Sequence, residues 1–269
     1  MIFTPPHKGQ VPDSTISTRK IISTGRGGTG KSTFVALALR YLRTPSLLVD
    51  LDPDSSLPSM IGVDLEREGK RTVCEVLYDV IMRRKQNVAP TVTTHDQMQS
   101  MLWSDALYEG KGFDLLTLGT KYIEGCYCAP DNLLRTTIQE LVRNYAHLVV
   151  DSPAGVEHLN RNVVSDVDDL FVLCDPSQKA LKHIKRVKRI LEQVGISYRN
   201  FYLVANHQFD STSESHLKEA GGTYLGRIEY DPEVDRCNLE GRSLLKLPDD
   251  SPARLSVKNL LARAGYPQK

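Results

Sequence analysis

The chain has 269 residues, of which 40% are hydrophobic and 25% charged, so it is long enough to bury one large α/β core. Its 34 lysines and arginines nearly balance its 33 aspartates and glutamates. This balance excludes a positive field over the whole protein that would attract nucleic acid, but it is compatible with local basic patches. No stretch approaches the roughly 18 consecutive apolar residues of a membrane span, and the polar N-terminus lacks a signal-peptide core. We therefore expect a cytoplasmic protein that binds neither membrane nor nucleic acid.

Residues 1–18 precede the first predicted strand and are expected to form a flexible extension. They contain Pro5, Pro6, Gly9 and Pro12 and show little apolar periodicity. Residues 19–269 are predicted to form a single domain.

A glycine-rich segment from Gly25 to Thr33 fits the pattern G-x-x-x-x-G-K-[ST] between an apolar strand end and a helical run. In such a loop, backbone N–H groups surround the phosphates of a nucleotide, and the helix N-terminus adds its dipole. Lys31 is expected to reach the β- and γ-phosphates, and Ser32 to offer its hydroxyl to Mg²⁺. The predicted phosphate-binding residues are Gly25, Gly27, Gly28, Thr29, Gly30, Lys31, Ser32 and Thr33.

Short apolar runs alternate with helical segments along the rest of the chain. The runs are Lys20–Ser23, Ser46–Asp50, Phe113–Leu118, His147–Asp151, Leu170–Cys174, Phe201–Asn206 and Tyr224–Ile228. Because these runs do not alternate between apolar and polar residues, we predict a doubly wound, mostly parallel α/β sheet with helices on both faces. The pattern weakens between residues 63 and 112, where helices are predicted over 71–84 and 97–107. This stretch is either an insertion over the nucleotide-binding edge or an ordinary pair of crossover helices.

Polar side chains follow several of the predicted strands, and ligands of such sheets bind beyond the carboxyl ends of the strands. These residues are Asp50, Asp52, Asp151, Asp175 and Asn206. Asp50 and Asp52 would point the same way if the strand continued through both, and they would then serve Mg²⁺ and water. The alternative for Asp52 is a solvated turn, and the alternative for Asn206 is a turn cap.

The five cysteines are odd in number and sparse, which does not indicate a disulfide framework. Cys126 and Cys128 form the one close pair, and in an extended segment both thiols would face one side, near enough to share a metal. Two thiolates do not complete a tetrahedral site, so a second copy of the chain would supply the other pair. The alternative is two buried or incidental cysteines.

Three of these segments resemble motifs of the MinD/ParA/nitrogenase-iron-protein ATPases. The loop Arg-Gly-Gly-Thr-Gly-Lys-Ser resembles their deviant Walker A loop, Asp50-Leu51-Asp52-Pro53 their D-x-D-P element, and Asp151-Ser152-Pro153-Ala154-Gly155 their D-x-P-A-G switch. This resemblance implies ATP and Mg²⁺ as cofactors.

The resemblance also implies a role for each matching residue. Asp52 would orient the attacking water with Asp50 as its support, Asp151 would bind Mg²⁺ through water, and Gly155 would approach the γ-phosphate. Asn206 would read the adenine edge. Arg26 stands where the family has a lysine that reaches the partner's nucleotide across a dimer, and its guanidinium keeps the charge.

Residues 124–135, 154–159 and 240–245 resemble the CooC-type accessory ATPases that mature nickel carbon monoxide dehydrogenases. The likeness covers nearly all of residues 20–261, with Arg26 and the N-terminal extension as departures. It implies an ATP-dependent homodimer in which Cys126 and Cys128 hold nickel or zinc at the subunit interface. It further implies a client nickel enzyme, either carbon monoxide dehydrogenase or acetyl-CoA synthase.

Two other functions compete with this interpretation. A MinD/ParA-like positioning ATPase would need a basic amphipathic surface, and residues 255–264 are only modestly amphipathic. An electron donor like the nitrogenase iron protein would need a four-iron cluster, against which the adjacent Cys126 and Cys128 argue.

Overall fold

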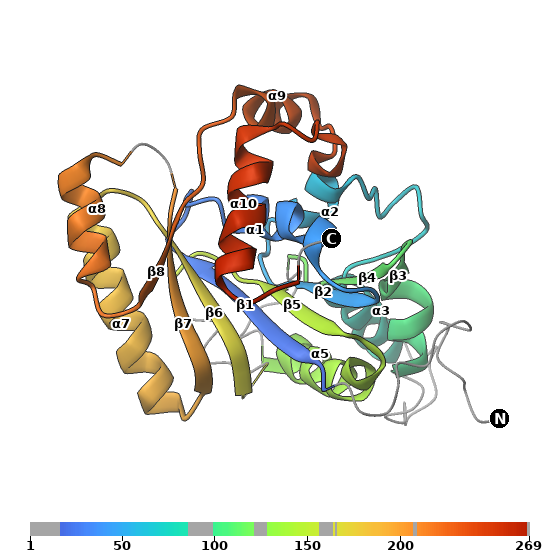
Figure 1. Cartoon of the computed structure of the whole chain (residues 1–269). Helices are drawn as coiled ribbons and strands as arrows, with labels where there is room; N and C mark the ends of the chain where they lie inside the picture. Colours follow the sequence, from blue (N-terminus) through green and yellow to red (C-terminus); the bar gives the residue numbers. More distant parts are fainter. Residues whose placement is uncertain are drawn as a thin grey trace.

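The structure is a computed structural model that describes residues 17–85, 99–120, 128–155, 164, 166–206 and 209–267. An eight-stranded sheet forms its centre. Its strand order is β3-β4-β2-β5-β1-β6-β7-β8 (Figure 1). The strands are β1 Arg19–Gly25, β2 Ser46–Asp50, β3 Tyr108–Glu109, β4 Phe113–Thr117, β5 His147–Asp151, β6 Asp166–Cys174, β7 Ser197–Ala205 and β8 Thr223–Arg227. Every neighbouring pair is parallel except β3 and β4, so the predicted doubly wound, mostly parallel α/β fold is confirmed.

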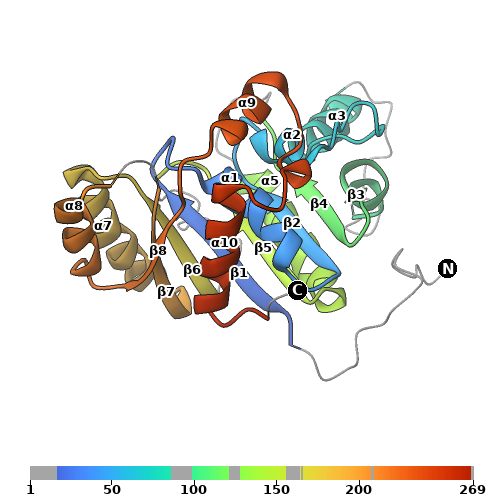
Figure 2. The same cartoon turned by 45° about the horizontal axis from the view of Figure 1, so that its top comes forward.

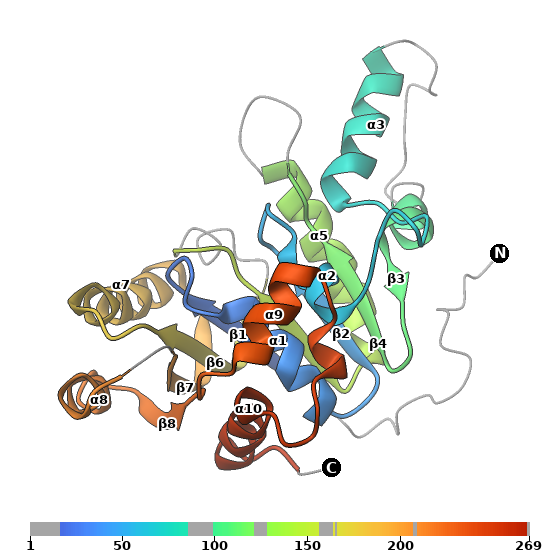
Figure 3. The same ribbon diagram turned by 90° about the horizontal axis from the view of Figure 1, so that it is seen from above.

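Helices cover both faces of the sheet, as Figure 3 shows from above. The α-helices are α1 Lys31–Ala38, α2 Ser56–Ile61, α3 Val73–Lys85, α5 Cys128–Leu141, α7 Gln178–Val194, α8 Ser211–Lys218, α9 Pro232–Glu240 and α10 Pro252–Arg263. Short 3-10 helices cover Leu39–Tyr41, Val142–Asn144 and Leu244–Lys246, and a π-helix covers Leu102–Ala106. None of the helices among these residues is long and apolar enough to cross a membrane.

Each face of the sheet has its own hydrophobic core, because successive strand residues point to opposite sides. In β2, Leu48 packs with α1, α2, α9 and α10 on one face, whereas Leu47 and Val49 pack with α3, α5, α7 and α8 on the other. Figure 2 shows α7 and α8 beside one end of the sheet and α3 beyond the other.

The predicted strands agree with the observed ones to within a few residues, but two local features were not predicted. The edge strand β3 has only two residues and pairs antiparallel with β4, too short a run to stand out in the sequence. Thr18, expected in the loose extension, is anchored instead, because its hydroxyl lies 2.8 Å from the carbonyl oxygens of Val142 and Tyr145.

Helix α3 confirms the helix predicted over 71–84, and its N-terminus is tied to the carboxyl end of β4. The Cys74 N–H donates to the Leu118 carbonyl over 3.0 Å, and Val73 and Val76 pack into the sheet core. Helix α3 therefore starts at the edge of the sheet where the strands end, and its first turns pack on the sheet core.

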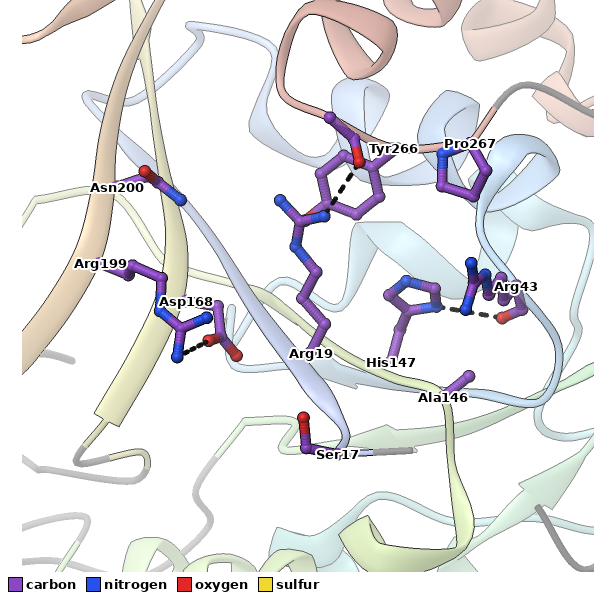
Figure 4. Close-up of a pocket in the computed structure, with 11 residues that line it drawn as sticks. Ser17, Arg19, Arg43, Ala146, His147, Asp168, Arg199, Asn200, Tyr266 and Pro267 are labelled. Atoms are coloured by element: carbon purple, nitrogen blue, oxygen red, sulfur yellow. Dashed lines mark hydrogen bonds and ion pairs between the residues drawn. The ribbon is translucent and has the colours of Figure 1, made fainter. Parts of the chain in front are cut away.

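A cavity of about 400 Å³ lies at the opposite edge, where β1, β5 and β6 begin (Figure 4). Beside it, the fully buried Asp169 accepts hydrogen bonds from Arg19 Nε over 2.5 Å, from Asn200 Nδ2 over 2.8 Å and from the Tyr266 hydroxyl. The Arg19 guanidinium also lies 3.8 Å from the centre of the Tyr266 ring. This network ties the chain after α10 to the first strand.

We expect Asp169→Ala to lower the free energy of unfolding by about 3 kcal/mol, because it removes the buried carboxylate that accepts from Arg19 Nε and from the Tyr266 hydroxyl. Urea unfolding measures this change. The matched control is Asp166→Ala, which removes an exposed ion pair to Lys20 from the same strand and should cost less than about 1 kcal/mol. Equal, small effects of the two substitutions would contradict a structural role for the buried network.

Candidate nucleotide and metal site

The glycine-rich loop joins β1 to α1, and two of its glycines have backbone conformations or surroundings that a side chain would not fit. Gly30 has φ +84°, and a Cβ there would lie 2.2 Å from Asn206 Nδ2. A Cβ on Gly25 would lie 2.6 Å from the Leu173 carbonyl oxygen. The loop therefore lies against β6 and β7 at the carboxyl edge of the sheet, as predicted.

Lys31 is buried at the first position of α1, with 6% of its surface exposed. Its ammonium donates to the Arg26 carbonyl oxygen over 3.1 Å, so the side chain curls back across the loop. Burial lowers the pKa of Lys31, and the nearby Asp151 and Asp52 carboxylates oppose that shift. A desolvated cation inside a ring of backbone N–H groups is a binding point for phosphate.

Asp50 and Asp151 lie side by side as register partners at the ends of β2 and β5. The two Asp50 oxygens accept from the backbone N–H groups of Asp52 and Leu57, over 3.0 and 3.2 Å. Asp50 therefore holds the loop after β2 in place, a geometry that suits the supporting role implied for it.

Both Asp151 oxygens, by contrast, are buried and have no hydrogen-bond partner in the described part of the chain. Burial raises the pKa of Asp151 to about 7, against the effects of the nearby Ser32 hydroxyl and Lys31 ammonium. Burial and the Asp151 charge also raise the pKa of Asp50 well above its usual value. A buried carboxylate without hydrogen-bond partners in the described structure is suited to bind a cation or a water molecule.

Asp52 lies outside β2, so the condition under which both aspartates would point the same way is not met. The strand ends at Asp50, and Asp52 Oδ1 accepts from the Asp54 N–H over 3.1 Å. Asp52 is half-exposed and forms the turn that the sequence offered as the alternative. The residue stays beside the phosphate loop, since its charge acts on Lys31.

Ser32 and Thr33 follow Lys31 in the first turn of α1. The Ser32 hydroxyl lies 3.3 Å from that of Ser56 in α2, and it also favours the ionised form of Asp151. Ser32 and Asp151 therefore bring a hydroxyl and a carboxylate to one place beside the phosphate loop, a donor set that Mg²⁺ accepts.

Arg26 is held by its own chain. Its Nη1 donates to Asp175 Oδ2 over 2.7 Å and to the Ser177 hydroxyl over 3.1 Å. Asp175 follows β6, and Ser177 caps α7. The sequence implied a contact across a dimer for Arg26; within one chain, the guanidinium is tied instead to the carboxyl edge of β6.

Gly155 also has an intramolecular partner, because its N–H donates to the Gly25 carbonyl oxygen over 3.2 Å. Its φ of +94° requires glycine. The sequence implied that this N–H approaches a γ-phosphate, so such an approach would break the bridge to Gly25. Residues 156–163, which follow Gly155, lie outside the described residues.

A cavity of about 600 Å³ opens beside the loop, large enough for a nucleoside. Gly28, Gly30, Thr33 and Asn206 line it, and the Asn206 amide donates to the Thr29 carbonyl oxygen over 2.9 Å. The sequence interpretation missed other lining residues, which follow β6 and β8: Pro176, Ile228, Glu229, Tyr230 and Asp231. Extending the rule for strand ends to β8 would have found the last four.

Gly27 and Thr29 complete the predicted loop. Gly27 lies against Ala154, and the Thr29 hydroxyl donates to the Arg26 carbonyl oxygen over 2.8 Å. The structure thus gathers the predicted residues of the phosphate loop, the acidic pair, Gly155 and Asn206 at one edge of the sheet.

The predicted metal pair cannot be placed in full, because Cys126 and the Cys128 side chain lie outside the described residues. The backbone shows that α5 starts at Cys128, so the chain is not extended at the second of the two cysteines. Cys74, Cys174 and Cys237 are buried and do not form disulfides. Among the described residues, no three histidine, cysteine or acidic side chains are grouped to hold a metal.

Comparisons with known proteins identify relatives along most of the chain. The model of the CobQ/CobB/MinD/ParA nucleotide binding domain matches residues 20–244. An uncharacterized ATP-binding protein of Methanocaldococcus jannaschii is 32% identical over 247 residues, covering 89% of this chain and 96% of the relative. The carbon monoxide dehydrogenase accessory protein CooC of Rhodospirillum rubrum is 26% identical over 239 residues, covering 85% and 90%.

Solved structures share the fold. A plasmid partition protein of Borrelia burgdorferi bound to AMPPNP aligns with a TM-score of 0.67 at 15% identity, covering 92% of this chain and 98% of that one. MinD of Pyrococcus horikoshii complexed with Mg-ADP aligns with a TM-score of 0.65 at 21% identity, covering 92% and 96%. At these identities the likeness concerns the fold.

Proposed function

Because the chain belongs to the CobQ/CobB/MinD/ParA nucleotide-binding family, we propose that it is a Mg²⁺-dependent ATPase that works as a homodimeric metallochaperone. In this proposal Cys126 and Cys128 carry a metal to a nickel enzyme such as carbon monoxide dehydrogenase, and residues 19–269 act as one unit. The similarity to CooC over 85% of the chain, together with the Cys-x-Cys pair, carries the metallochaperone role.

The donor groups around the phosphate loop support the ATPase step. The Ser32 hydroxyl and the buried Asp151, whose oxygens are without partners in the described structure, would hold Mg²⁺ directly or through water. The ion would neutralise charge on the β- and γ-phosphates, which is most of what phosphoryl transfer requires. Lys31 would bind the same phosphates, Asn206 the base, and Asp52 would orient the attacking water.

Arg26 connects this step to dimer formation. For its guanidinium to reach a partner's nucleotide, it has to leave Asp175 and Ser177 of its own chain. The phosphate charge would replace the Asp175 carboxylate as the binding partner, and the two anions are chemically alike for a guanidinium. ATP-bound dimers would then be favoured over the free chain.

We expect Arg26→Ala and Asp52→Ala each to lose most ATP hydrolysis, and an equal mixture of the two to regain about a quarter of the wild-type rate. A heterodimer has one site with both Asp52 and the partner's Arg26 intact, and half of the dimers are heterodimers. Phosphate release at saturating Mg-ATP measures the recovery. If heterodimers form without any recovery, Arg26 acts within its own chain.

The metallochaperone role is tested by reactivating a nickel-free carbon monoxide dehydrogenase with the nickel-loaded protein. We expect reactivation with Mg-ATP, and none with AMPPNP or with the Cys126→Ser/Cys128→Ser protein. Nickel-free acetyl-CoA synthase serves as the second client in the same assay. Reactivation that is independent of both nucleotide and cysteines would contradict the proposed role.

A positioning ATPase is the second candidate, since MinD of Bacillus subtilis is 27% identical over 262 residues. The described part of α10 gives this candidate little support, because Val257, Leu260 and Leu261 are buried in the core and do not form an apolar surface for a membrane. Co-sedimentation with anionic vesicles or with DNA in the presence of ATP distinguishes the two candidates.

A further inference from the structure

Helix α7 concentrates positive charge that the nucleotide site does not use. Its 17 residues contain six lysines and arginines and one acidic residue, Glu192, whereas the whole chain has a net charge of only +1. Five of these cations are exposed: Lys179, Lys182, Lys185, Arg186 and Arg189. Within the described part of the chain, none of the five forms an ion pair with an acidic side chain.

The spacing of the exposed cations makes them a continuous surface, which we call the basic face of α7. Lys179, Lys182, Arg186 and Arg189 follow one another at intervals of three or four residues, so they share one side of the helix over about 15 Å. The apolar residues Ala180, Ile184, Val187 and Leu191 point to the other side and pack on the sheet.

The basic face begins at the nucleotide site. Figure 3 shows the N-terminus of α7 beside the loop that follows β1. A cavity of about 480 Å³ lies between them, with walls from the phosphate loop, from the segment after β5 and from α7. Its lining residues are Arg26, Gly27, Ala154, Gly155, Lys179, Lys182, His183 and Arg186.

The electrostatic environment of this cavity is positive. His183 contributes a buried Nε2 atom without a hydrogen-bond partner among the described residues. Burial, then the charges of Arg26, Arg186 and Lys31, lower the pKa of His183 to about 4, so the imidazole is neutral and leaves the guanidinium and ammonium groups to attract an anion. Among the described residues, no hydrogen bond or ion pair joins these α7 cations to the phosphate loop or to Asp50 and Asp151.

We propose that the basic face of α7 and the adjoining cavity bind an acidic segment of a protein partner. This inference rests on the proposed function in one respect, that a client protein is recognised, and it adds the chemistry of the recognised segment. Carboxylates spaced along a helix or a strand match cations spaced by one helical turn, and the cavity accepts individual side chains.

The same surface fits single-stranded nucleic acid and membranes less well. Single strands bind on aromatic platforms, and the exposed aromatic residues of the described structure, Tyr198 and Tyr230, do not line this cavity. A membrane-bound helix inserts apolar residues beside its basic ones, whereas the exposed large hydrophobic residues, Leu239 and Leu255 among them, lie outside α7.

A labelled peptide of ten glutamates tests the proposal by fluorescence anisotropy on the full chain. We expect salt-sensitive binding, weakened about tenfold or more in Lys182→Glu/Arg186→Glu. The matched control, Arg67→Glu/Lys111→Glu, changes the net charge equally at exposed positions outside α7 and should bind within about twofold of wild type. Circular dichroism confirms that each variant is folded.

The same samples are tested with a DNA duplex, with phosphatidylserine vesicles and for ATP hydrolysis. Equal loss of peptide binding in both charge-reversed variants would overturn the proposal, as would binding of duplex or vesicles, but not peptide, through the basic face. Because peptide binding and ATP turnover are measured separately, failure of the docking surface is distinguishable from failure of the proposed ATPase.

Discussion

Lys31→Ala is expected to reduce ATP hydrolysis by roughly 10²- to 10³-fold, the loss typical when a preorganised charge-stabilising donor is removed. The ammonium is buried, and its one hydrogen bond in the described structure goes to the Arg26 carbonyl oxygen inside its own loop. Without it, the β- and γ-phosphates lose their cation inside the loop, so binding of ATP falls together with turnover.

The protein should still fold, because the substitution removes a desolvated charge that pairs with a carbonyl group and not with an ion-pair partner. Thermal unfolding with and without Mg-ATP separates the two effects: the variant should unfold cooperatively but lose the ATP-induced rise in melting temperature. Lys20→Ala is the control, since Lys20 lies on β1 and its ammonium forms an exposed ion pair to Asp166. Wild-type hydrolysis in Lys31→Ala would refute the assignment of the site.

Cys126→Ser/Cys128→Ser is expected to abolish binding of one metal ion per two chains. One chain offers two adjacent thiols, a closed soft-metal site prefers four, and a two-fold axis supplies the missing pair. Metal should therefore promote dimer formation in the wild type. Because the thiols must lose protons to bind, affinity should fall as the pH is lowered.

Equilibrium dialysis with nickel or zinc, combined with analytical sedimentation, measures both the stoichiometry and the dimer. Cys237→Ser is the control. This buried thiol lies in α9 and packs in the core on the face of the sheet opposite to α5, the helix that begins at Cys128. One metal per chain, or unchanged binding in the double variant, would return Cys126 and Cys128 to a structural role. Bound zinc alone would not identify the metal that the protein carries, since thiolates bind both ions.

Much of the fold could be predicted because it depends on local patterns. Apolar runs without alternation mark the parallel strands. Gly25 and Gly30 mark the loop after β1, where the surroundings leave no room for a Cβ. The convergence of Asp50 and Asp151 followed from the rule that parallel strands end at one edge.

What could not be predicted depends on contacts between distant residues. Arg26 and Asp175 are 149 positions apart, so their ion pair is visible only in the folded chain. The turn at Asp52 was offered by the sequence only as an alternative, because Asp-Pro-Asp-Ser is compatible with either conformation, and the hydrogen bond from Asp54 decides between them. The charge of α7 is plain in its sequence, but its place beside the phosphate loop is not.

Gly155 takes part in two structural features. Its N–H donates to the Gly25 carbonyl oxygen, and the residue lines the cavity beside α7. A phosphate that draws this N–H away from Gly25 therefore also alters the cavity that an acidic segment would enter. Two equilibria that share a residue in this way are thermodynamically linked, and linkage is reciprocal. By whatever factor ATP changes the affinity for a docked partner, that partner changes the affinity for ATP by the same factor. Binding of the client would therefore change how tightly the nucleotide site holds ATP.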